Sequence, residues 1–288
     1  MPGNHFLNRI RRIDKMSRIL PILFNTEMIR AILDGRKTCT RRIAKKVPKE
    51  TYRIEEETQN GNLMFQCIWG GYMPDVQGFV DGYTNLSPPY QPGDILWVRE
   101  TWCWCPCWDC GMDTEEGCCD KETDRIYHPD RREYGCYGYK ASFQEYEEPF
   151  ERWHPSIHMP RKAARIFLVV KNVKLEPLQD ITITEIRNEG LSSMAVHVGD
   201  TEMAMAEWKS LWNGTVKKND LNRYGWEANP WVWVIEFERI DRIVGGETNG
   251  QENSGTVHRC LCTDQGDGSG DSKVEEKERS NSGFCPGQ

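Results

Sequence analysis

The sequence lacks any run of about 20 consecutive apolar residues, the length that a membrane-spanning helix needs. Basic residues near its start, among them Arg11 and Arg12, are followed by Asp14 and Lys15 rather than by an apolar segment, which is unlike a secretory signal peptide. We therefore expect a cytoplasmic protein without a membrane partner. In that compartment the 12 cysteines are expected to be thiols or metal ligands rather than disulfides.

The sequence also lacks a general excess of basic residues, because its net charge at pH 7 is −7. This argues against a protein that binds nucleic acid over its whole surface. Residues 1–50 differ from the rest, with 13 Lys and Arg against 4 Asp and Glu. A basic region on an acidic body can attract phosphate groups locally, but it can also be an ordinary solvated surface.

Apolar side chains are scarce over residues 246–288, which are rich in Gly, Ser, Asp, Glu and Asn. Such a segment cannot bury enough apolar surface to offset the entropy that is lost on ordering. We therefore predict a disordered acidic tail over residues 244–288, and an unstructured leader over residues 1–17. No internal repeat is visible, so residues 18–243 are expected to form one domain.

Between these ends, strand and helix patterns are mixed, which predicts an α+β fold. Helices are expected over residues 26–34, after a capping box at Thr182 and Glu185, and from residue 200 or 201 onward. The last of these helices is expected to bury Met205, Trp208, Leu211 and Trp212. Strands are expected over residues 18–24, 52–56, 63–69, 95–102, 137–143, 165–175 and 231–240.

A basic motif follows the first expected helix. Gly35 stands where a left-handed residue commonly ends a helix. The four cations after it are Arg36, Lys37, Arg41 and Arg42. Lys37 and Thr40 are three residues apart, so they share a face if the segment makes a helical turn. A Lys beside a Thr hydroxyl can bind phosphate or can act as a base beside a nucleophile, and a solvated basic loop is the third possibility.

The spacing of Gly35, Lys37, Thr40 and Arg42 gives the pattern G-x-K-x-x-T-x-R, which resembles the signature of ASCH domains, a family of PUA-like β-barrels. Three later stretches resemble the branch of this family that is common among bacteriophage-encoded proteins. They are Tyr90–Trp102, Pro155–Pro160 with Ala164–Phe167, and Tyr224–Trp233. The resemblance implies a small PUA-like β-barrel with flanking helices, interrupted by a Cys-rich insertion at about residues 103–136.

In the branch of the family that hydrolyses N4-acetylcytidine, a Lys, a Thr three residues on and a Glu on a later strand are catalytic. The resemblance places the first two roles on Lys37 and Thr40, and our candidate for the third is Glu100. Lys37 is then the base for Thr40, whose hydroxyl attacks the amide carbonyl, and Glu100 protonates the leaving amine. Strand alternation puts Glu100 on one face with Leu96 and Val98, either at the wet end of the strand or in a lined pocket.

The same residues can instead hold a nucleotide without reacting with it. Aromatic side chains stack on nucleobases and basic side chains bind phosphates, and both kinds are frequent around Glu100. The residues expected to bind RNA or a modified nucleotide are Gly35, Arg36, Arg41, Arg42, Arg99, Trp102, Tyr139, Lys140 and His158. Some of the aromatic residues are equally expected in the core.

The expected insertion is rich in cysteine and poor in apolar side chains. Cys107 and Cys110 have the spacing of a zinc knuckle, and Cys118 and Cys119 can complete a tetrahedral site. A structural zinc ion would stabilise a segment with little core of its own. A loop of reduced thiols is the alternative, and no other cofactor is expected.

Functions of different kinds remain open at this point. The favoured one is binding of RNA or of a modified nucleotide, and the second is amide hydrolysis of N4-acylated cytidine nucleosides by Lys37, Thr40 and Glu100. A weaker third is that of a phage accessory protein that acts through protein partners in the bacterial host cytoplasm. Whether the three side chains converge on one point distinguishes hydrolysis from binding.

Overall fold

The computed structural model describes residues 10–12, 17–73, 78–106, 126–128, 130–143, 152–240 and 242–244. In this part of the chain the fold is mixed α+β, as expected. The strands form sheets of five, three, three and two strands. These sheets are open, and none of the described strands closes a barrel. No described helix has the length and apolar character needed to cross a membrane.

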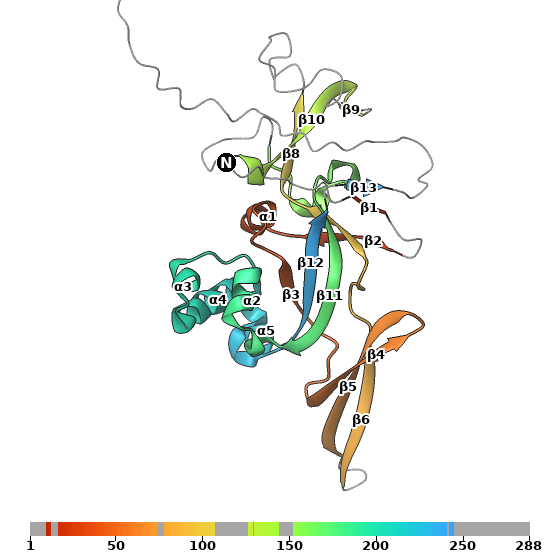
Figure 1. Ribbon diagram of the computed structural model, residues 1–288, viewed down its shortest axis with the longest axis vertical. Helices are drawn as coiled ribbons and strands as arrows, with labels where there is room; N and C mark the ends of the chain where they lie inside the picture. The colour runs from red at the N-terminus through yellow and green to blue at the C-terminus, as the bar shows by residue number, and fades with distance from the viewer. Residues whose placement is uncertain are drawn as a thin grey trace, which may run out of the picture.

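A five-stranded sheet lies at the centre of the molecule, with its strands in the order β2-β7-β11-β12-β3 (Figure 1). The strands are β2 (Ile19–Leu23), β7 (Ile95–Arg99), β11 (Phe167–Pro177), β12 (Trp231–Ile240) and β3 (Cys39–Ile43). β2 and β7 are parallel, and the other neighbouring pairs are antiparallel. β11 and β12 are rich in Val, Ile and aromatic residues, which pack well on a pleated surface, and they form the long axis of the sheet.

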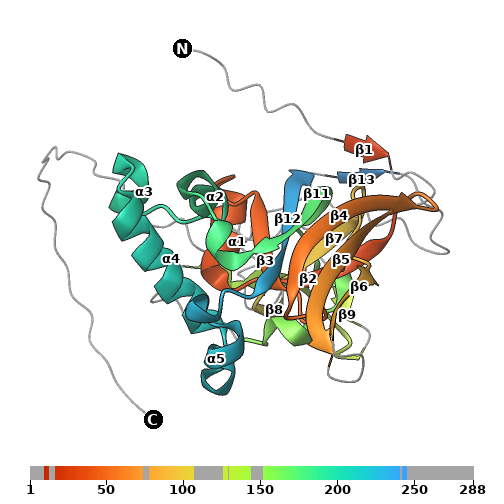
Figure 2. The same cartoon turned by 90° about the horizontal axis from the view of Figure 1, so that it is seen from below.

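Helices cover one face of this sheet (Figure 2). They are α2 (Ile183–Asn188), α3 (Met194–Val198), α4 (Thr201–Thr215) and α5 (Leu221–Tyr224). Trp208 and Trp212 of α4 share an apolar cluster with Val232 and Val234 of β12. Leu211, which was expected on the same side, is 37 % exposed. The two tryptophans are one helical turn apart and define the buried stripe, and Leu211 lies beside that stripe.

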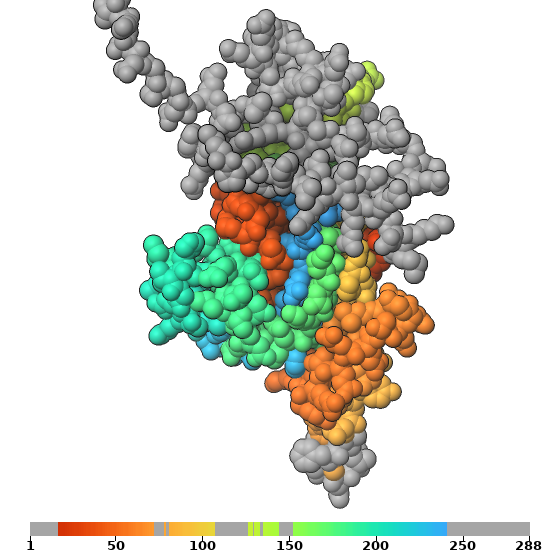
Figure 3. Space-filling model, viewed as in Figure 1, coloured from red at the N-terminus to blue at the C-terminus, as the bar shows by residue number. Residues whose placement is uncertain are grey.

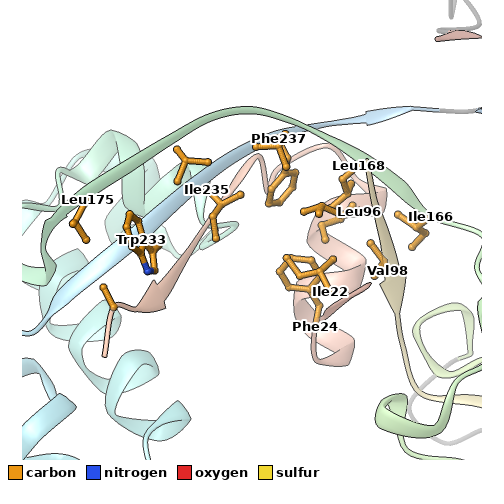
Figure 4. Close-up of a cluster of buried hydrophobic side chains, with 14 of the residues drawn as sticks. Ile22, Phe24, Leu96, Val98, Ile166, Leu168, Leu175, Trp233, Ile235 and Phe237 are labelled. Carbon is orange, nitrogen blue, oxygen red and sulfur yellow. The ribbon is translucent and has the colours of Figure 1, made fainter. Parts of the chain in front are cut away.

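The opposite face of the sheet holds the main apolar core (Figure 4). Helix α1 (Thr26–Leu33) packs against this core through Ile29 and Ile32. The side chain of Asn25 caps the helix by accepting a hydrogen bond from the Met28 N–H at 2.8 Å. Gly35, with φ of 75°, follows the end of the helix. The helix expected over residues 26–34 is therefore confirmed together with its glycine stop.

A three-stranded sheet extends from one end of the body (Figures 1 and 3). It consists of β4 (Thr51–Gln59), β5 (Asn62–Met73) and β6 (Gly78–Leu86). Asn60 and Gly61 connect β4 to β5 with φ values of 52° and 77°, as a two-residue hairpin turn requires. Phe65 and Cys67 of β5 belong to the main core. The two strands expected here and the turn between them are confirmed.

A second three-stranded sheet lies at the other end of the body, in the order β8-β10-β9. Its strands are β8 (Trp102–Pro106), β10 (Glu133–Tyr139) and β9 (Ile126–His128). The single strand expected over residues 95–102 is thus two strands in different sheets. The chain leaves the central sheet after Arg99, where the Glu100 carboxylate pairs with Arg165.

Two short parallel strands lie near the predicted ends of the domain, residues 18 and 243. β1 (Ile10–Arg12) pairs with β13 (Arg242–Val244), so three residues of the expected leader lie in a strand. The rest of the leader before residue 17, residues 245–288 of the expected tail, and residues 107–125 of the expected insertion lie outside the described residues.

The start of α2 offers a test of the local signals. Thr182→Ala should lower the free energy of unfolding by about 1 kcal/mol. The Thr182 hydroxyl accepts from the Glu185 N–H at 3.3 Å, and the Glu185 carboxylate accepts from the Thr182 N–H at 2.9 Å, so alanine removes half of the capping box. Thr201→Ala, at the exposed first residue of α4, is the matched control. Equal losses for both variants in urea denaturation would contradict the prediction.

The capping box at Thr182 and Glu185 also makes the stability of the fold depend on pH. The pKa of Glu185 is lowered: burial opposes the shift, and the hydrogen bonds from Thr182 and the charge of Arg41 outweigh it. A carboxyl group with a lowered pKa in the folded state stabilises that state above its ordinary pKa. This contribution is therefore complete above the ordinary value of 4.5 and is lost as the pH falls through the lower folded-state value.

Candidate functional site

Phe24, just after β2, is the residue around which the candidate site gathers. Its ring is 4 % exposed and packs against Phe237, with 6.0 Å between the ring centroids (Figure 4). The Lys37 Nζ atom lies 5.7 Å from the Phe24 ring centroid, and the Arg42 Cζ atom lies 5.4 Å from it. The face of an aromatic ring attracts cations at this range. Two cations of the basic motif therefore meet on one buried ring.

Lys37 is fully enclosed, with 0 % of its side chain exposed. Its Nζ donates to a carboxylate oxygen of Glu189 at 2.6 Å and to the carbonyl oxygen of the same residue at 2.9 Å. The two residues also form an isolated β-bridge, which ties the end of α2 to the basic motif. Two of the three ammonium donors are thus directed at Glu189.

The rest of the motif is a strand rather than a helical turn, and its alternate residues lie on two faces. Thr40 and Arg42 of β3 pair with Ile235 and Trp233 of β12, on the face of the main core. Thr40 is 3 % exposed. Arg42 donates to the carbonyl oxygen of Leu23 at 2.7 Å, and burial lowers its pKa.

Arg41 lies on the other face of β3, toward the helices, and its side chain has 0 % exposure. It contacts the carboxylates of Glu176, Glu185 and Glu189 at 2.8, 3.3 and 3.4 Å. Cys39 shares this face, and burial raises the pKa of its thiol to about 12. Arg41 is therefore committed to a buried ion-pair network that shares Glu189 with Lys37.

Glu100, between β7 and β8, forms a second buried ion pair and is 1 % exposed. Its two carboxylate oxygens accept from Arg165 Nε at 2.9 Å and from Arg165 Nη2 at 2.8 Å. Arg165 also donates to Ser142 Oγ at 2.7 Å, and its guanidinium carbon lies 4.0 Å from the Tyr139 ring centroid. The Tyr139 hydroxyl donates to the carbonyl oxygen of Ala163 at 2.7 Å, and burial raises its pKa.

The backbone and α1 connect the two ion pairs. The Phe24 N–H donates to the carbonyl oxygen of Arg99 at 3.4 Å, and Arg99 precedes Glu100. Arg30 of α1 donates to the carbonyl oxygens of residues 141 and 143 at 3.3 and 3.0 Å. The pair of Lys37 with Glu189 and the pair of Glu100 with Arg165 are therefore both linked to the segment of Phe24 and α1.

Several predicted ligand residues gather around Glu100. Trp102 stacks on His154 with 4.7 Å between centroids and 24° between the ring planes. The exposed Lys140 donates its N–H to the carbonyl oxygen of Thr101 at 3.0 Å. Tyr139, described above, precedes Lys140. These residues form the rim of the site next to β8.

Arg99 and His158 extend this rim. The Arg99 side chain donates to the carbonyl oxygen of Ile157 and lies over the Trp97 ring, with 5.4 Å from Cζ to the centroid. His158, the residue after Ile157, is exposed. It lies in the 3-10 turn Ser156–His158. The structure thus brings Arg99 and His158 to one segment of the surface.

Gly35 and Arg36 lie elsewhere, between α1 and the end of α2. Arg36 pairs with Asp34 at 2.8 Å and donates to the carbonyl oxygen of Gly190 at 2.6 Å. Both Gly35 and Arg36 are exposed. They face the helix layer rather than the rim next to β8.

Four residues of the site escaped the sequence analysis: Phe24, His154, Arg165 and Glu189. Glu189 is 152 residues from Lys37, Arg165 is 65 residues from Glu100 and His154 is 52 residues from Trp102, whereas Phe24 lies 13 residues before Lys37. No local pattern points to such partners. The only available signal was the position of Arg165 inside the stretch Ala164–Phe167 that carries the family resemblance.

The predicted zinc ligands Cys107, Cys110, Cys118 and Cys119 lie outside the described residues. Within the described ranges, no group of three or more His, Cys, Asp or Glu side chains is arranged to hold a metal ion.

No family model matches this sequence, and no curated protein or solved structure matches it either. The resemblance to ASCH domains therefore rests on the sequence motifs.

Proposed function

We propose that this chain is an RNA- or nucleotide-binding protein with a PUA-like fold of the ASCH type. The observation that carries the proposal is the presence of two buried ion pairs, Lys37 with Glu189 and Glu100 with Arg165, each linked to the segment of Phe24 and α1. A buried ion pair is weak support for stability, because the cost of removing charges from water can exceed their attraction. We take two such pairs in one region as marking the site, because charges are retained there at a cost to stability.

The groups around the second ion pair suit a nucleotide ligand. Arg99 and Lys140 provide cations that can bind phosphates. The stacked rings of Trp102 and His154 offer an aromatic surface for a base. Arg42 adds a partly buried cation beside Phe24. Arg41 is left out of this proposal because its charge is matched by three carboxylates.

The contacts of the three residues with possible catalytic roles favour binding over hydrolysis. Lys37 directs two donors at Glu189, whereas a base for Thr40 needs a lone pair directed at the Thr40 hydroxyl. Glu100 accepts two hydrogen bonds from Arg165, whereas a general acid must carry the proton that it donates.

Hydrolysis of N4-acylated cytidine is the second candidate. One observation favours it: Thr40 lies on the same face of β3 as Arg42, so its hydroxyl belongs to the side of the sheet on which Lys37 and Arg42 meet Phe24. A ligand that displaced Glu189 from Lys37 would be needed for this chemistry.

The proposal is tested by fluorescence anisotropy with short single-stranded RNAs over a range of salt concentrations. Arg42→Gln and Arg99→Gln should each weaken binding and lower the slope of log affinity against log salt by about 1. Arg53→Gln is the matched control, because Arg53 is exposed on β4 and pairs with Glu55. Absence of RNA and nucleotide binding by the wild type, or equal effects of all three variants, would contradict the proposal.

The same preparations separate the two candidates when they are incubated with N4-acetylcytidine and analysed by mass spectrometry. A binding protein leaves this nucleoside intact. Turnover by the wild type that Lys37→Arg and Thr40→Ala both abolish, with folding intact, would replace binding by hydrolysis, because Arg does not give up its proton near neutral pH.

A further inference from the structure

The sheet of β4, β5 and β6, which projects from the body (Figures 1 and 3), has one face in the core and one open face. Phe65 and Cys67 of β5 lie in the main core. The alternate residues of the same strand, Gln66, Ile68 and Gly70, therefore belong to the open face, and all three are partly exposed. The proposed nucleotide site includes no residue of this face.

Two tyrosines stand on the open face, one on each outer strand. Tyr83 of β6 is directly opposite Ile68 in the register, so it shares the face of Ile68. Tyr52 of β4 is on the same face, because its Cε1 atom lies 3.5 Å from the position that a Cβ atom of Gly70 would occupy. Tyr52 is 62 % exposed and Tyr83 is 67 % exposed. Tyrosine is enriched at interfaces because its ring is apolar and its hydroxyl is polar.

Gly70 allows a carboxylate to approach the Tyr52 ring. Asp81 of β6 is directly opposite Gly70, and its Oδ1 atom lies 2.8 Å from the position of the missing Cβ atom. A methyl group at this position would displace the Asp81 carboxylate. Among the described residues this carboxylate has no ion-pair or hydrogen-bond partner. A carboxylate beside an exposed aromatic ring suits a cation, which is attracted by the negative charge and by the face of the ring.

The remaining charges of the open face are mostly negative. Arg53, Glu55 and Glu57 of β4 lie on this face in the register, and Arg53 pairs with Glu55. Glu57 and Asp81 are thus without a cationic partner in the part of the chain that the structure describes. The residues of β5 that oppose Glu57 and Asp81 are six positions apart. At about 3.3 Å per residue, the two carboxylates are about 20 Å apart along the strand.

We infer that the open face of this sheet binds an extended segment of a protein partner through two basic side chains of that segment. One cation binds between Tyr52 and Asp81, and the other pairs with Glu57. An extended chain spans about 20 Å in six residues, so basic residues about six positions apart reach both carboxylates, whereas a single small amine reaches only one. The negative charge of the face repels phosphate groups, so its ligand is a basic peptide rather than a nucleic acid.

The test is an NMR titration of the isotope-labelled full chain with a synthetic peptide that has arginine at both ends and about five Gly and Ser residues between them. The amide signals of β4, β5 and β6 should shift. Tyr52→Ala and Asp81→Asn should each weaken binding about 2–5-fold, the range of exposed cation–π contacts and exposed ion pairs. A peptide with a single residue between the arginines should bind more weakly, because it cannot reach Glu57 and Asp81 together.

Two matched pairs of variants make the inference falsifiable. Gly70→Ala keeps every charge and ring but displaces the Asp81 carboxylate, so it should weaken peptide binding. Gly71→Ala should leave binding unchanged, because a Cβ atom there meets nothing within 4 Å. Glu202→Gln removes an exposed carboxylate of α4 and is the control for Asp81→Asn, because a chain of net charge −7 attracts any basic peptide.

Circular dichroism checks the fold of each variant, and RNA affinity should be the same in all of them. The inference is overturned if Asp81→Asn and Glu202→Gln have equal effects on peptide binding, or if the peptide shifts signals outside this sheet instead. It is also overturned if RNA, rather than the peptide, shifts the signals of β4, β5 and β6. None of these results bears on the proposed nucleotide site, which uses other residues.

Discussion

Glu189→Ala should lower the free energy of unfolding by about 3–5 kcal/mol, because it leaves the charge of Lys37 buried without its carboxylate. The Lys37 side chain has 0 % exposure, and the carboxylate oxygen that accepts from it is 2.6 Å away. Arg41 loses one of three carboxylate partners in the same change and keeps Glu176 and Glu185. Thermal and urea denaturation measure the loss.

Two comparisons show whether burial is the cause. Glu27→Ala removes an ion pair with Arg30 whose carboxylate side chain is 78 % exposed, and it should cost about 0–1 kcal/mol. The double change Lys37→Met/Glu189→Ala should recover part of the loss, because no unpaired ammonium is then buried. If Glu189→Ala and Glu27→Ala destabilise the protein equally, the ion pair does not behave as a buried one.

Phe24→Ala should destabilise the fold by about 3–5 kcal/mol, the usual cost of truncating a buried Phe. It should also weaken RNA binding by the folded protein, because Lys37 and Arg42 both rest on this ring. Phe24→Leu keeps most of the volume and should cost less than about 1.5 kcal/mol, but it removes the aromatic face. RNA affinity should therefore fall in both variants.

Ile22→Ala is the matched control for the second effect. Ile22 belongs to the same core and is 2 % exposed, and no cation lies over it. Its truncation should lower stability and leave RNA affinity unchanged once the folded fraction is taken into account. Equal losses of affinity for Ile22→Ala and Phe24→Ala would show that the Phe24 ring has no specific part in the site.

The sequence predicted correctly those helices, turns and strands that are fixed by residues close together in the chain. The capping box at Thr182 and Glu185 is formed as expected, and the turn at Asn60 and Gly61 joins two antiparallel strands. Strand β12 has the bounds expected from its apolar run over residues 231–240. In each case the hydrogen bonds or packing that fix the element come from residues close in sequence or from a continuous apolar pattern.

The end of β7 at Arg99 was not predicted from the local pattern. Alternation places Leu96, Val98 and Glu100 on one face, and all three are buried, but it also predicts that the strand continues to Trp102. The chain instead changes sheets, because Glu100 pairs with Arg165, 65 residues away, and its N–H donates to the Met159 sulfur at 3.2 Å. The alternation of apolar residues within one strand does not reveal a partner 65 residues away.

The sequence predicted some residues of the candidate site but not their partners. The basic motif identifies Lys37, Thr40 and Arg42, which lie on or near the face of Phe24. It does not reveal that Lys37 is paired with Glu189, 152 residues away. Nor does it show that Arg41 belongs to the other face, because the strand character of β3 is set by its pairing with β12.

The position of β3 has a consequence for self-association. β3 is the last strand of the five-stranded sheet and has β12 as its strand neighbour, and a free sheet edge can recruit a strand from another molecule. Here the inward-directed charge of Arg41 is compensated by three carboxylates of its own chain. A foreign strand added beside β3 would have to pack next to this network of charges. The charges that hold the basic motif in place thus also discourage the sheet from growing into an aggregate.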